Sequence, residues 1–367
     1  MASSTHKQQQ QLPNMYGATA APPPTPSTQS NNLLSTSDAA DALSRLLHRL
    51  PPTLSLPTRR SPASTCLPAV SLSDQNPDLL DDLLSHSGFF QLTGHSVPAE
   101  LARSAESESL ALFDLPDDKK ESYFPKNWPL GYEGDHDEDG DGLGESFRLD
   151  SSCSTESSTE LSLDSLLEFT SALEKVGLRI IRLLSDAAGF ENPVEEDPTR
   201  FSSLMWISKG LAGNKPVSAG GFYPYILCLQ YQIRYRKYSL LSDSGWATVT
   251  PQVDSLMVTL GDIAHVWSNG KLKKVRGRPV LANLGDDNSR CISMSLLITP
   301  PMDSKVSPQP HKLPIGRGNE EKREEQIDGS TAEEEERLFN SFCFEDYAWR
   351  VYHERHLIND PLDRYRI

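Results

Sequence analysis

The sequence has few of the features that would assign it at once to a class of protein. Its five cysteines form no Cys-x-x-Cys pair, and an odd, scattered set of this kind favours neither a disulfide framework nor a zinc site. No apolar run approaches the ~20 residues that a membrane-spanning helix requires. These absences predict a soluble protein from a reducing compartment. The cytoplasm is the simplest location, and the plastid and the nucleus stay open.

Basic residues are also in short supply. The chain carries 35 Lys and Arg against 51 Asp and Glu, which gives a net charge of -16. Such a charge repels nucleic acids and anionic membranes unless a local basic patch makes the contact. We therefore expect no membrane contact, and we rank nucleic acid below a small hydrophobic molecule or a protein as the partner.

The N-terminal part has little apolar surface. Residues 1–36 are rich in Gln, Ser, Thr and Pro, so we expect them to be disordered. The start has no charged segment followed by an apolar one, unlike a secretory signal. Its Ser, Thr and Ala are similar to those of a plastid transit peptide, although no Arg precedes Arg45. The leucines between Ser37 and Pro51 predict a short amphipathic helix.

After Leu67 the hydrophobic pattern changes between helix and strand periods. The expected elements are strands at Leu67–Leu72 and within Gly88–Pro98, and helices at Asp78–Ser85, Ala99–Phe113, about Leu161–Ala188 and Phe344–Leu357. From about Ser203 the pattern is that of strands, with alternation from Tyr223 to Tyr235. Short strands without βαβ spacing, beside the expected helices, predict an α+β fold whose core is an antiparallel jelly roll or sandwich, and not a doubly wound sheet.

The dipeptide Asn269-Gly270 lies between two apolar runs, Asp254–Trp267 and Lys271–Leu284. Asn-Gly in that setting is the strongest short-range signal for a β-hairpin. We therefore predict that the two runs pair as strands. His265, in the first run, is interpreted as a hydrogen-bonded core histidine and not as a metal ligand.

These patterns divide the chain into five segments. Residues 1–60 are assigned to a disordered tail with a short amphipathic helix, 61–200 to an N-terminal region of helices and strands, and 201–300 to the jelly-roll core. Residues 301–340 are rich in Pro and then in charge, which predicts a flexible surface excursion. Residues 341–367 hold a C-terminal helix expected to pack on the core.

Three motifs imitate binding sites. Asp135–Gly140 begins like a calcium loop, but its twelfth position is Ser146 instead of Glu, which makes a solvated acidic loop the simpler interpretation. His136 and Glu138 have metal-ligand spacing, on a loop that offers no rigid face. Arg276–Pro279 is similar to a minor-groove clip, yet such clips act from flexible arms, whereas this one continues a strand.

Several ordered motifs resemble the plant 2-oxoglutarate and Fe(II)-dependent dioxygenases, in particular the gibberellin oxidase-like branch. Leu67–Leu72, Gly88–Pro98 and Leu112–Tyr123 are similar to that family's opening strand, its Gly-Phe-Phe segment and the helix after it. Asp254–Val275 is similar to its Gly-Asp turn and Ser-Asn-Gly hairpin, and Cys343–Ile367 to its last helix and tail. The resemblance covers nearly everything after Leu67 and implies that family's fold, an α+β fold with a double-stranded β-helix (jelly roll) core flanked by helices.

The resemblance also implies an iron site, in which a His-x-Asp pair and a distal His leave positions open for 2-oxoglutarate and oxygen. The corresponding positions here are Tyr223, Tyr225 and Gly277. Tyrosine is neutral near pH 7, because its pKa is ~10, and glycine has no side chain. We therefore interpret the three as equivalents of the ligands that hold no metal, and we expect the two tyrosines to line the core.

An Arg-x-Ser motif anchors 2-oxoglutarate in the family that this sequence resembles. Here Arg290 and Ser293 are three residues apart, so a regular strand would point them to opposite faces, and only a bulge would restore the register. We retain Arg290 and Ser293 as candidate contacts for 2-oxoglutarate or another anion.

Three functions follow as hypotheses. The leading one is a non-catalytic member of this family that serves as a small-molecule binding or regulatory module and holds no cofactor. The second is an active, gibberellin oxidase-like oxidoreductase that uses Fe(II) and 2-oxoglutarate through metal ligands elsewhere in the chain. The third is a DNA contact through the basic segment Lys271–Arg278.

Overall fold

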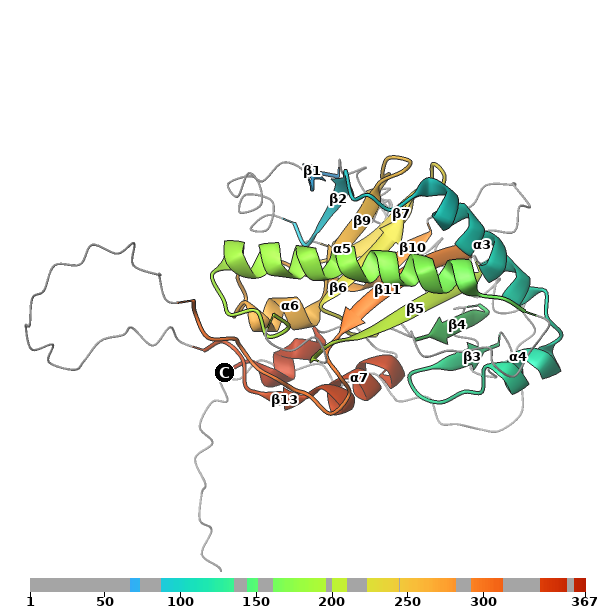
Figure 1. Ribbon diagram of the computed structural model, residues 1–367. Helices are drawn as coiled ribbons and strands as arrows, with labels where there is room; N and C mark the ends of the chain where they lie inside the picture. The colour runs from blue at the N-terminus through green and yellow to red at the C-terminus, as the bar shows by residue number, and fades with distance from the viewer. Residues whose placement is uncertain are drawn as a thin grey trace, which may run out of the picture. The chain divides into compact units, whose positions relative to one another are not determined.

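The computed structural model describes most of the chain after Leu67 (Figure 1). The described residues are 67–72, 87–134, 144–150, 161–195, 200–209, 223–243, 245–281, 292–312, 337–354 and 360–367. The predicted helices before Pro51 and at Asp78–Ser85 lie outside them, as does the acidic loop Asp135–Gly140. None of the helices in the described ranges has both the length and the apolar character needed to cross a membrane.

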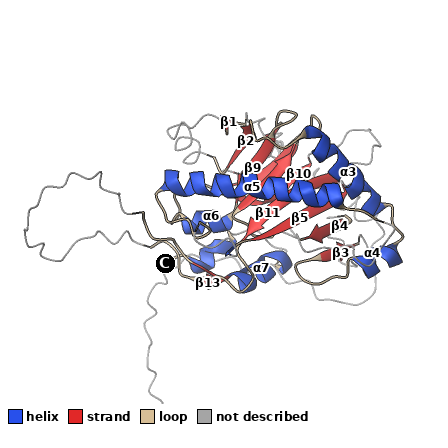
Figure 2. Ribbon diagram, in the orientation of Figure 1, coloured by secondary structure: helices blue, strands red, loops and turns tan. Residues whose placement is uncertain are grey.

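An eight-stranded sheet forms the larger wall of the core (Figure 2). Its strand order is β1-β2-β9-β6-β11-β5-β4-β3, and neighbours are antiparallel except for β1 with β2. The bounds are β1 Ala69–Ser71, β2 Phe89–Thr93, β3 Gly131–Glu133, β4 Ser146–Leu149, β5 Ser202–Lys209, β6 Leu227–Tyr231, β9 Leu256–Leu260 and β11 Ile292–Thr299.

A second, antiparallel sheet has the order β10-β7-β8. Its strands are β7 Tyr238–Ser242, β8 Gly245–Val249 and β10 Val275–Leu281. Side chains of both sheets share one buried apolar cluster, to which Phe89 and Met257 come from the larger sheet and Leu240 and Val275 from the smaller. The two sheets therefore face each other across a common core, and the predicted α+β jelly roll is confirmed.

Helices α3 (Ala99–Phe113) and α5 (Asp164–Ala188) cover the outer face of the larger sheet (Figure 1). Gly177 of α5 lets the helix approach closely, because a Cβ there would lie 2.2 Å from Cδ1 of Ile298 and 3.3 Å from Cδ1 of Leu229. Alternate residues of β11 and β6 therefore point to the helices, and the residues between them point into the jelly roll. This alternation places the polar side chains described below on the inner face.

The predicted hairpin at Asn269-Gly270 is wrong. The second half of the first run forms helix α6 (Asp262–Trp267), and β9 pairs with β2 and β6, whereas β10 pairs with β7. A short run that is apolar on every side does not distinguish a buried helix from a buried strand. Asn269 and Gly270 do adopt positive φ angles of 50° and 85°, but in the turn that leaves the helix.

The strand predicted from Tyr223 to Tyr235 is shorter than the alternation indicated. β6 comprises only Leu227–Tyr231, and Tyr223 and Tyr225 lie in the segment before it. The helix α4 (Asp117–Tyr123) lies within Leu112–Tyr123, the segment that the resemblance matched to a helix. Strands β3 and β4 were not predicted, because each is too short to carry a clear period. The predictions of α3 and α5 are confirmed, the first with the same bounds and the second with a start three residues later.

The C-terminal part packs against the start of β10 and α6. It contains the strand pair β12 (Lys305–Val306) and β13 (Phe342–Cys343), helix α7 (Phe344–His353) and a 3-10 helix at Pro361–Tyr365. The prediction of the last helix is confirmed for its start at Phe344. Its predicted end at Leu357 is wrong, because the helix ends at His353 and Glu354 has an extended backbone.

Candidate functional site

Two of the three positions that correspond to iron ligands are in direct contact. The Tyr225 hydroxyl donates a hydrogen bond to the backbone carbonyl of Gly277 at 2.6 Å, and it lies 3.1 Å from Oγ1 of Thr259. Tyr225 precedes β6, whereas Gly277 lies in β10 of the other sheet. The phenol therefore bridges the two sheets at the place where the family resemblance puts the metal.

The backbone on both sides fixes the position of Tyr225. The amide of Ile226 donates to the carbonyl of Ile298 at 2.8 Å, and the amide of Ile263 donates to the carbonyl of Tyr225 at 3.3 Å. Gly261 packs so tightly here that a Cβ would lie 2.1 Å from the Tyr225 carbonyl oxygen. Tyr225 is consequently almost fully buried, as the sequence predicted for a core residue.

Tyr223 is directed to a different set of residues. Its hydroxyl lies 3.3 Å from Sδ of Met302, and its ring meets Trp128 and Phe344 edge-on, with centroids 5.7 Å and 6.2 Å apart. Tyr223 is also buried, so the prediction that both tyrosines line the core is confirmed. The two phenols thus fill space in the core and contact different surroundings.

Burial keeps both phenols protonated. Desolvation raises the pKa of Tyr223 far above its ordinary value, although Arg148 acts in the opposite direction. Desolvation likewise raises the pKa of Tyr225 well above normal, and the charge of Asp262 adds to the increase. Near neutral pH both side chains are therefore neutral hydrogen-bond donors, and neither supplies a phenolate.

Gly277 lies in a bulge of β10. Its φ is +67°, a left-handed conformation that favours glycine, and the pairing with β7 shifts register between Arg276 and Val280. The bulge changes which side chains point inward. Arg278 lies with its guanidinium carbon 4.4 Å from the ring centroid of Trp206, and its Nη1 donates to Oγ of Ser208 at 3.0 Å.

Around Arg278 lies a group of buried polar side chains that we call the β5–β11 patch. It consists of Trp206 and Ser208 of β5, Gln230 of β6, Arg278 of β10, and Ser293 and Ser295 of β11. Ser293 pairs with Ser208 and Ser295 with Trp206, so these four side chains share one face of the sheet. The amide of Gln230 donates to the Ser295 hydroxyl, which joins the third strand to the patch.

Three buried atoms of this patch make no hydrogen bond within the described chain. They are Nε1 of Trp206, Oε1 of Gln230 and Oγ of Ser293, from side chains that are 1%, 2% and 8% exposed. Buried polar atoms in native proteins are nearly always paired, because an unpaired one costs about 1–3 kcal/mol. The β5–β11 patch is therefore chemically incomplete, unlike the surroundings of Tyr225.

A second arginine lies against the same tryptophan. The guanidinium carbon of Arg148 is 5.3 Å from the Trp206 ring, its Nη1 donates to the Tyr352 hydroxyl at 2.6 Å, and its Nη2 lies 3.1 Å from Oε2 of Glu133. Burial raises the pKa of Glu133, but the charge of Arg148 and the Tyr352 hydroxyl outweigh it, and the pKa is lowered overall. Arg148 thus has a carboxylate counterion.

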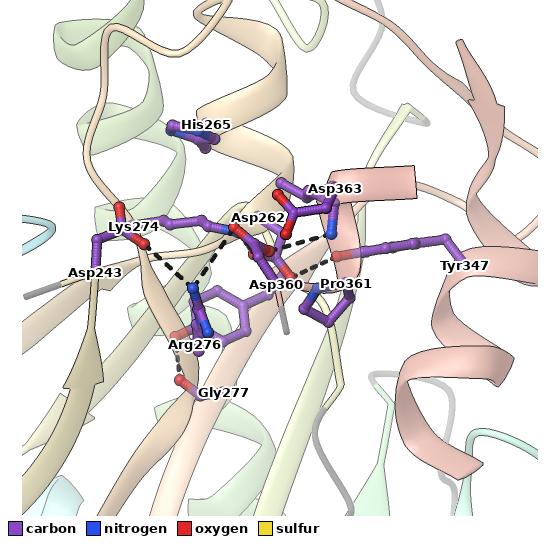
Figure 3. Close-up of polar contacts among 12 residues, drawn as sticks. Asp243, Asp262, His265, Lys274, Arg276, Gly277, Tyr347, Asp360, Pro361 and Asp363 are labelled. Carbon is purple, nitrogen blue, oxygen red and sulfur yellow. Dashed lines mark hydrogen bonds and ion pairs between the residues drawn. The ribbon is translucent and has the colours of Figure 1, made fainter. Parts of the chain in front are cut away.

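The opposite side of Gly277 holds a buried ionic network (Figure 3). Lys274 is 1% exposed, and its Nζ lies 2.8 Å from Oδ1 of Asp262 and 2.7 Å from Oδ1 of Asp360. The Tyr347 hydroxyl donates to Oδ2 of Asp262 at 2.7 Å. Burial raises the pKa of Asp360, but Lys274 outweighs it and the net pKa is lowered. The network joins the C-terminal segment to α6 and β10.

The other predicted site residues fall in different places. Ser293 belongs to the β5–β11 patch, whereas Arg290 lies outside the described residues, so their relative orientation stays a prediction. His265 is buried, with Nδ1 2.6 Å from the Leu272 carbonyl, as expected of a hydrogen-bonded core histidine. Arg276 contacts Asp360 at 3.7 Å, so both arginines of the basic motif interact with groups of this chain.

Among the described residues no group of three or more His, Cys, Asp or Glu is placed so that it could hold a metal ion. The calcium-like loop at Asp135–Gly140 and the pair His136 and Glu138 are not in that part of the chain.

Sequence reasoning missed the two cations on either side of Gly277. Lys274 was treated as part of a basic surface segment, yet it is buried between Asp262 and Asp360. One sequence feature could have indicated this: Lys274 directly precedes Val275 at the start of an apolar strand. A lysine buried there needs a buried counterion. Nothing in the spacing indicated that Arg278 would turn inward, because that depends on the bulge.

Comparisons with known proteins agree with this fold. A family model described as the N-terminal part of non-haem dioxygenases in morphine synthesis matches residues 67–166. Among curated proteins, a bi-functional coumaroyl CoA and feruloyl CoA ortho-hydroxylase of Ipomoea batatas is 23% identical over 322 residues, 79% of each chain. Gibberellin 2-beta-dioxygenase 1 of Arabidopsis thaliana is 24% identical over 317 residues, 79% of this chain and 89% of the relative.

Solved structures agree with the same fold. JOX2, crystallised with 2OG, Fe and JA, superimposes with a TM-score of 0.65 at 18% identity, over 88% of this chain and 97% of that one. A rice dioxygenase for auxin oxidation superimposes with a TM-score of 0.56 at 19% identity, over 82% of this chain and all of the other. Taken with the sequence matches over both halves of the chain, the protein belongs to the plant 2-oxoglutarate and Fe(II)-dependent dioxygenase family.

Proposed function

We propose that this protein is a non-catalytic member of its family that serves as a binding or regulatory module for a small molecule. The observation that carries the proposal is the hydrogen bond from Tyr225 to the Gly277 carbonyl at 2.6 Å. This bond pairs two of the three residues that the family resemblance matches to iron ligands with each other. The third, Tyr223, is held by Met302, Trp128 and Phe344.

The donor set at these positions does not fit divalent iron. A facial triad needs two imidazole nitrogens and an ionised carboxylate, with open positions beside them. Here the side chains are two protonated phenols, and Gly277 offers only a carbonyl that already accepts a hydrogen bond. We therefore derive no reaction step through iron at this place. The Tyr225 phenol instead joins the two sheets, and Tyr223 packs against Met302, Trp128 and Phe344.

The binding role falls to the rest of the inner face. The β5–β11 patch supplies polar groups that have no hydrogen-bond partner in the described part of the chain. Its Gln230 pairs in register with Met257, which belongs to the apolar cluster shared by the two sheets. A small molecule with an apolar body and a polar end suits such a lining. The absence of a Cys-x-x-Cys pair and the acidic net charge support a cytoplasmic location. We also expect a protein partner that binds this protein differently when the small molecule is bound.

The alternative is an active 2-oxoglutarate-dependent oxidoreductase, which the activities of the relatives favour. Its metal ligands would have to include residues outside the described ranges, because no suitable group lies within them. This requirement makes the alternative sharply testable.

Iron content and turnover separate the two. Full-length protein, purified and reconstituted with Fe(II) without oxygen, is expected to retain far less than one equivalent of iron after desalting, and to release no succinate from 2-oxoglutarate above the level without enzyme. Gibberellin 2-beta-dioxygenase 1, carried through the same steps, serves as the positive control. One bound equivalent of Fe(II) together with succinate release would sink the proposal and establish the alternative.

A further inference from the structure

The β5–β11 patch carries a positive charge that the described chain does not balance. Arg148 and Arg278 both lie against the Trp206 ring, at 5.3 Å and 4.4 Å. Arg148 has Glu133 as its counterion. The only polar contact of Arg278 among the described residues is the Ser208 hydroxyl, and no carboxylate lies within ion-pair distance of it there. Two cations and one anion leave one charge uncompensated.

Charges away from water are normally paired, because removing an ion from water costs several kcal/mol. Desolvation around Arg278 lowers its pKa to about 10, and the nearby charge of Arg148 contributes. Arg278 as a whole residue is only partly buried, whereas its guanidinium is desolvated. A desolvated cation with no carboxylate within ion-pair distance among the described residues is the arrangement expected of a site for an anion.

The unpaired atoms beside it define what else that anion carries. The indole N–H of Trp206 is a donor and the Ser293 hydroxyl donates or accepts, so both suit anionic oxygens. Oε1 of Gln230 is an acceptor and requires a hydroxyl or other donor on the ligand. A planar carboxylate matches the two parallel N–H groups of a guanidinium, which a single-atom anion does not.

We propose that the β5–β11 patch binds a small carboxylate that also bears a hydroxyl group, with Arg278 as its anchor, without any metal. Trp206 N–H and the Ser293 hydroxyl hold the carboxylate oxygens alongside Arg278, and Gln230 accepts from the ligand hydroxyl. The inference rests on the proposed function, because it makes this patch the place where the non-catalytic module binds its small molecule. It assigns the anion contact to β10, not to Arg290.

The test is calorimetric titration of full-length protein treated with EDTA. The probes are malate, succinate, sulfate and 2-oxoglutarate, of which only malate has both a carboxylate and a hydroxyl. Malate is expected to bind roughly twofold to tenfold more tightly than succinate, the effect of one added hydrogen bond. Sulfate is expected to bind more weakly than either. Sulfate that binds as tightly as malate overturns the assignment to a carboxylate.

Variants locate the site. Arg278→Gln is expected to weaken the binding of malate on the order of tenfold to a hundredfold, because it removes a charge-assisted pair of hydrogen bonds. Trp206→Phe keeps an aromatic ring beneath Arg278 and loses only the N–H, so it is expected to weaken the binding of malate by a smaller factor. Gln230→Leu should make the affinities for malate and succinate equal. Arg182→Gln, at an exposed arginine of α5, is the matched control and should leave the affinity unchanged.

Each outcome decides the matter. Circular dichroism and urea midpoints establish that each variant is folded. If Arg278→Gln is folded and binds malate as tightly as the wild type, the inference is overturned. Absence of binding by all four probes means that water satisfies the patch, which also overturns it. Binding that appears only after Fe(II) is added overturns this inference and the proposed function together. Metal-free binding that depends on Arg278 supports the inference whatever the iron assay gives.

Discussion

Lys274 and Arg278 lie four residues apart on either side of Gly277, yet their surroundings are opposite. Lys274 is 1% exposed and contacts two carboxylates, at 2.8 Å and 2.7 Å. Arg278 is partly exposed and has no carboxylate within ion-pair distance among the described residues. A cation balanced by the fold is a structural element, whereas one that the fold leaves unbalanced is available for a ligand. The bulge at Gly277 lies between Lys274, which directly precedes β10, and Arg278, which lies within that strand.

The same contrast holds for hydrogen bonds. On the Tyr225 side, the phenol, the Gly277 carbonyl and Thr259 are joined to one another. On the Trp206 side, three buried polar atoms make no hydrogen bond within the described chain. The hydrogen-bonded surroundings of Tyr225 and the unpaired polar atoms of the β5–β11 patch are therefore separate features, and substitutions can test them separately.

The largest expected effect is at Lys274. Lys274→Met removes the cation and leaves Asp262 and Asp360 buried with less compensation, so we expect it to lower the free energy of unfolding by about 3–5 kcal/mol. Urea unfolding of the full chain measures the change. Lys273→Met is the matched control, because Lys273 is exposed and its replacement should stay within about 0.5 kcal/mol. Equal effects at both lysines would remove the structural half of the comparison.

A smaller loss is expected at Tyr225. Tyr225→Phe deletes the hydroxyl that joins Gly277 and Thr259, leaves the buried carbonyl without that donor, and should cost about 1–3 kcal/mol. Tyr235→Phe is the control, since that side chain is 70% exposed. A cost at Tyr225 no larger than at Tyr235 would mean that the bridge between the sheets contributes nothing.

The pH dependence sharpens this test. Burial raises the pKa of Tyr225 above its unfolded value of ~10, so the folded state keeps a proton that the unfolded state loses. Its stabilising contribution is complete below about pH 10 and declines as pH rises, by about 1.4 kcal/mol per pH unit. The difference between the wild type and Tyr225→Phe should therefore shrink between pH 9 and 11. A constant difference would contradict the raised pKa.

The sequence predicted those features that depend on local pattern. The hydrophobic pattern predicted α3 and α5, and the alternation after Ser203 predicted the strands of the jelly roll. It failed at α6, where a short run buried on all sides carries no period, and at β3 and β4, which are too short for one. Local pattern has no information about such elements, because tertiary contacts alone decide them.

The candidate site divides in the same way. The correspondence of Tyr223, Tyr225 and Gly277 to iron ligands came from the family resemblance and stays a prediction. The burial of both tyrosines, which their aromatic character predicted, is confirmed. The hydrogen bond between Tyr225 and Gly277 could not be predicted from the sequence, because the two residues are 52 positions apart in the chain and lie at different sheets of the fold. The inward turn of Arg278 depends on a register shift in β10, which leaves no mark in residue types alone.

The smallest expected effect, and the most informative, is at Arg278. Without ligand, Arg278→Met should change the free energy of unfolding by no more than about 1 kcal/mol, because losing the Ser208 hydrogen bond is offset by removing an unbalanced, desolvated cation. With malate at ten times its dissociation constant, the wild type should gain about 1.4 kcal/mol and the variant nothing. Arg182→Met, at an exposed site, should respond to malate like the wild type. A loss of several kcal/mol without ligand would instead group Arg278 with Lys274 as a structural cation, because only a charge that the fold itself has balanced is costly to remove.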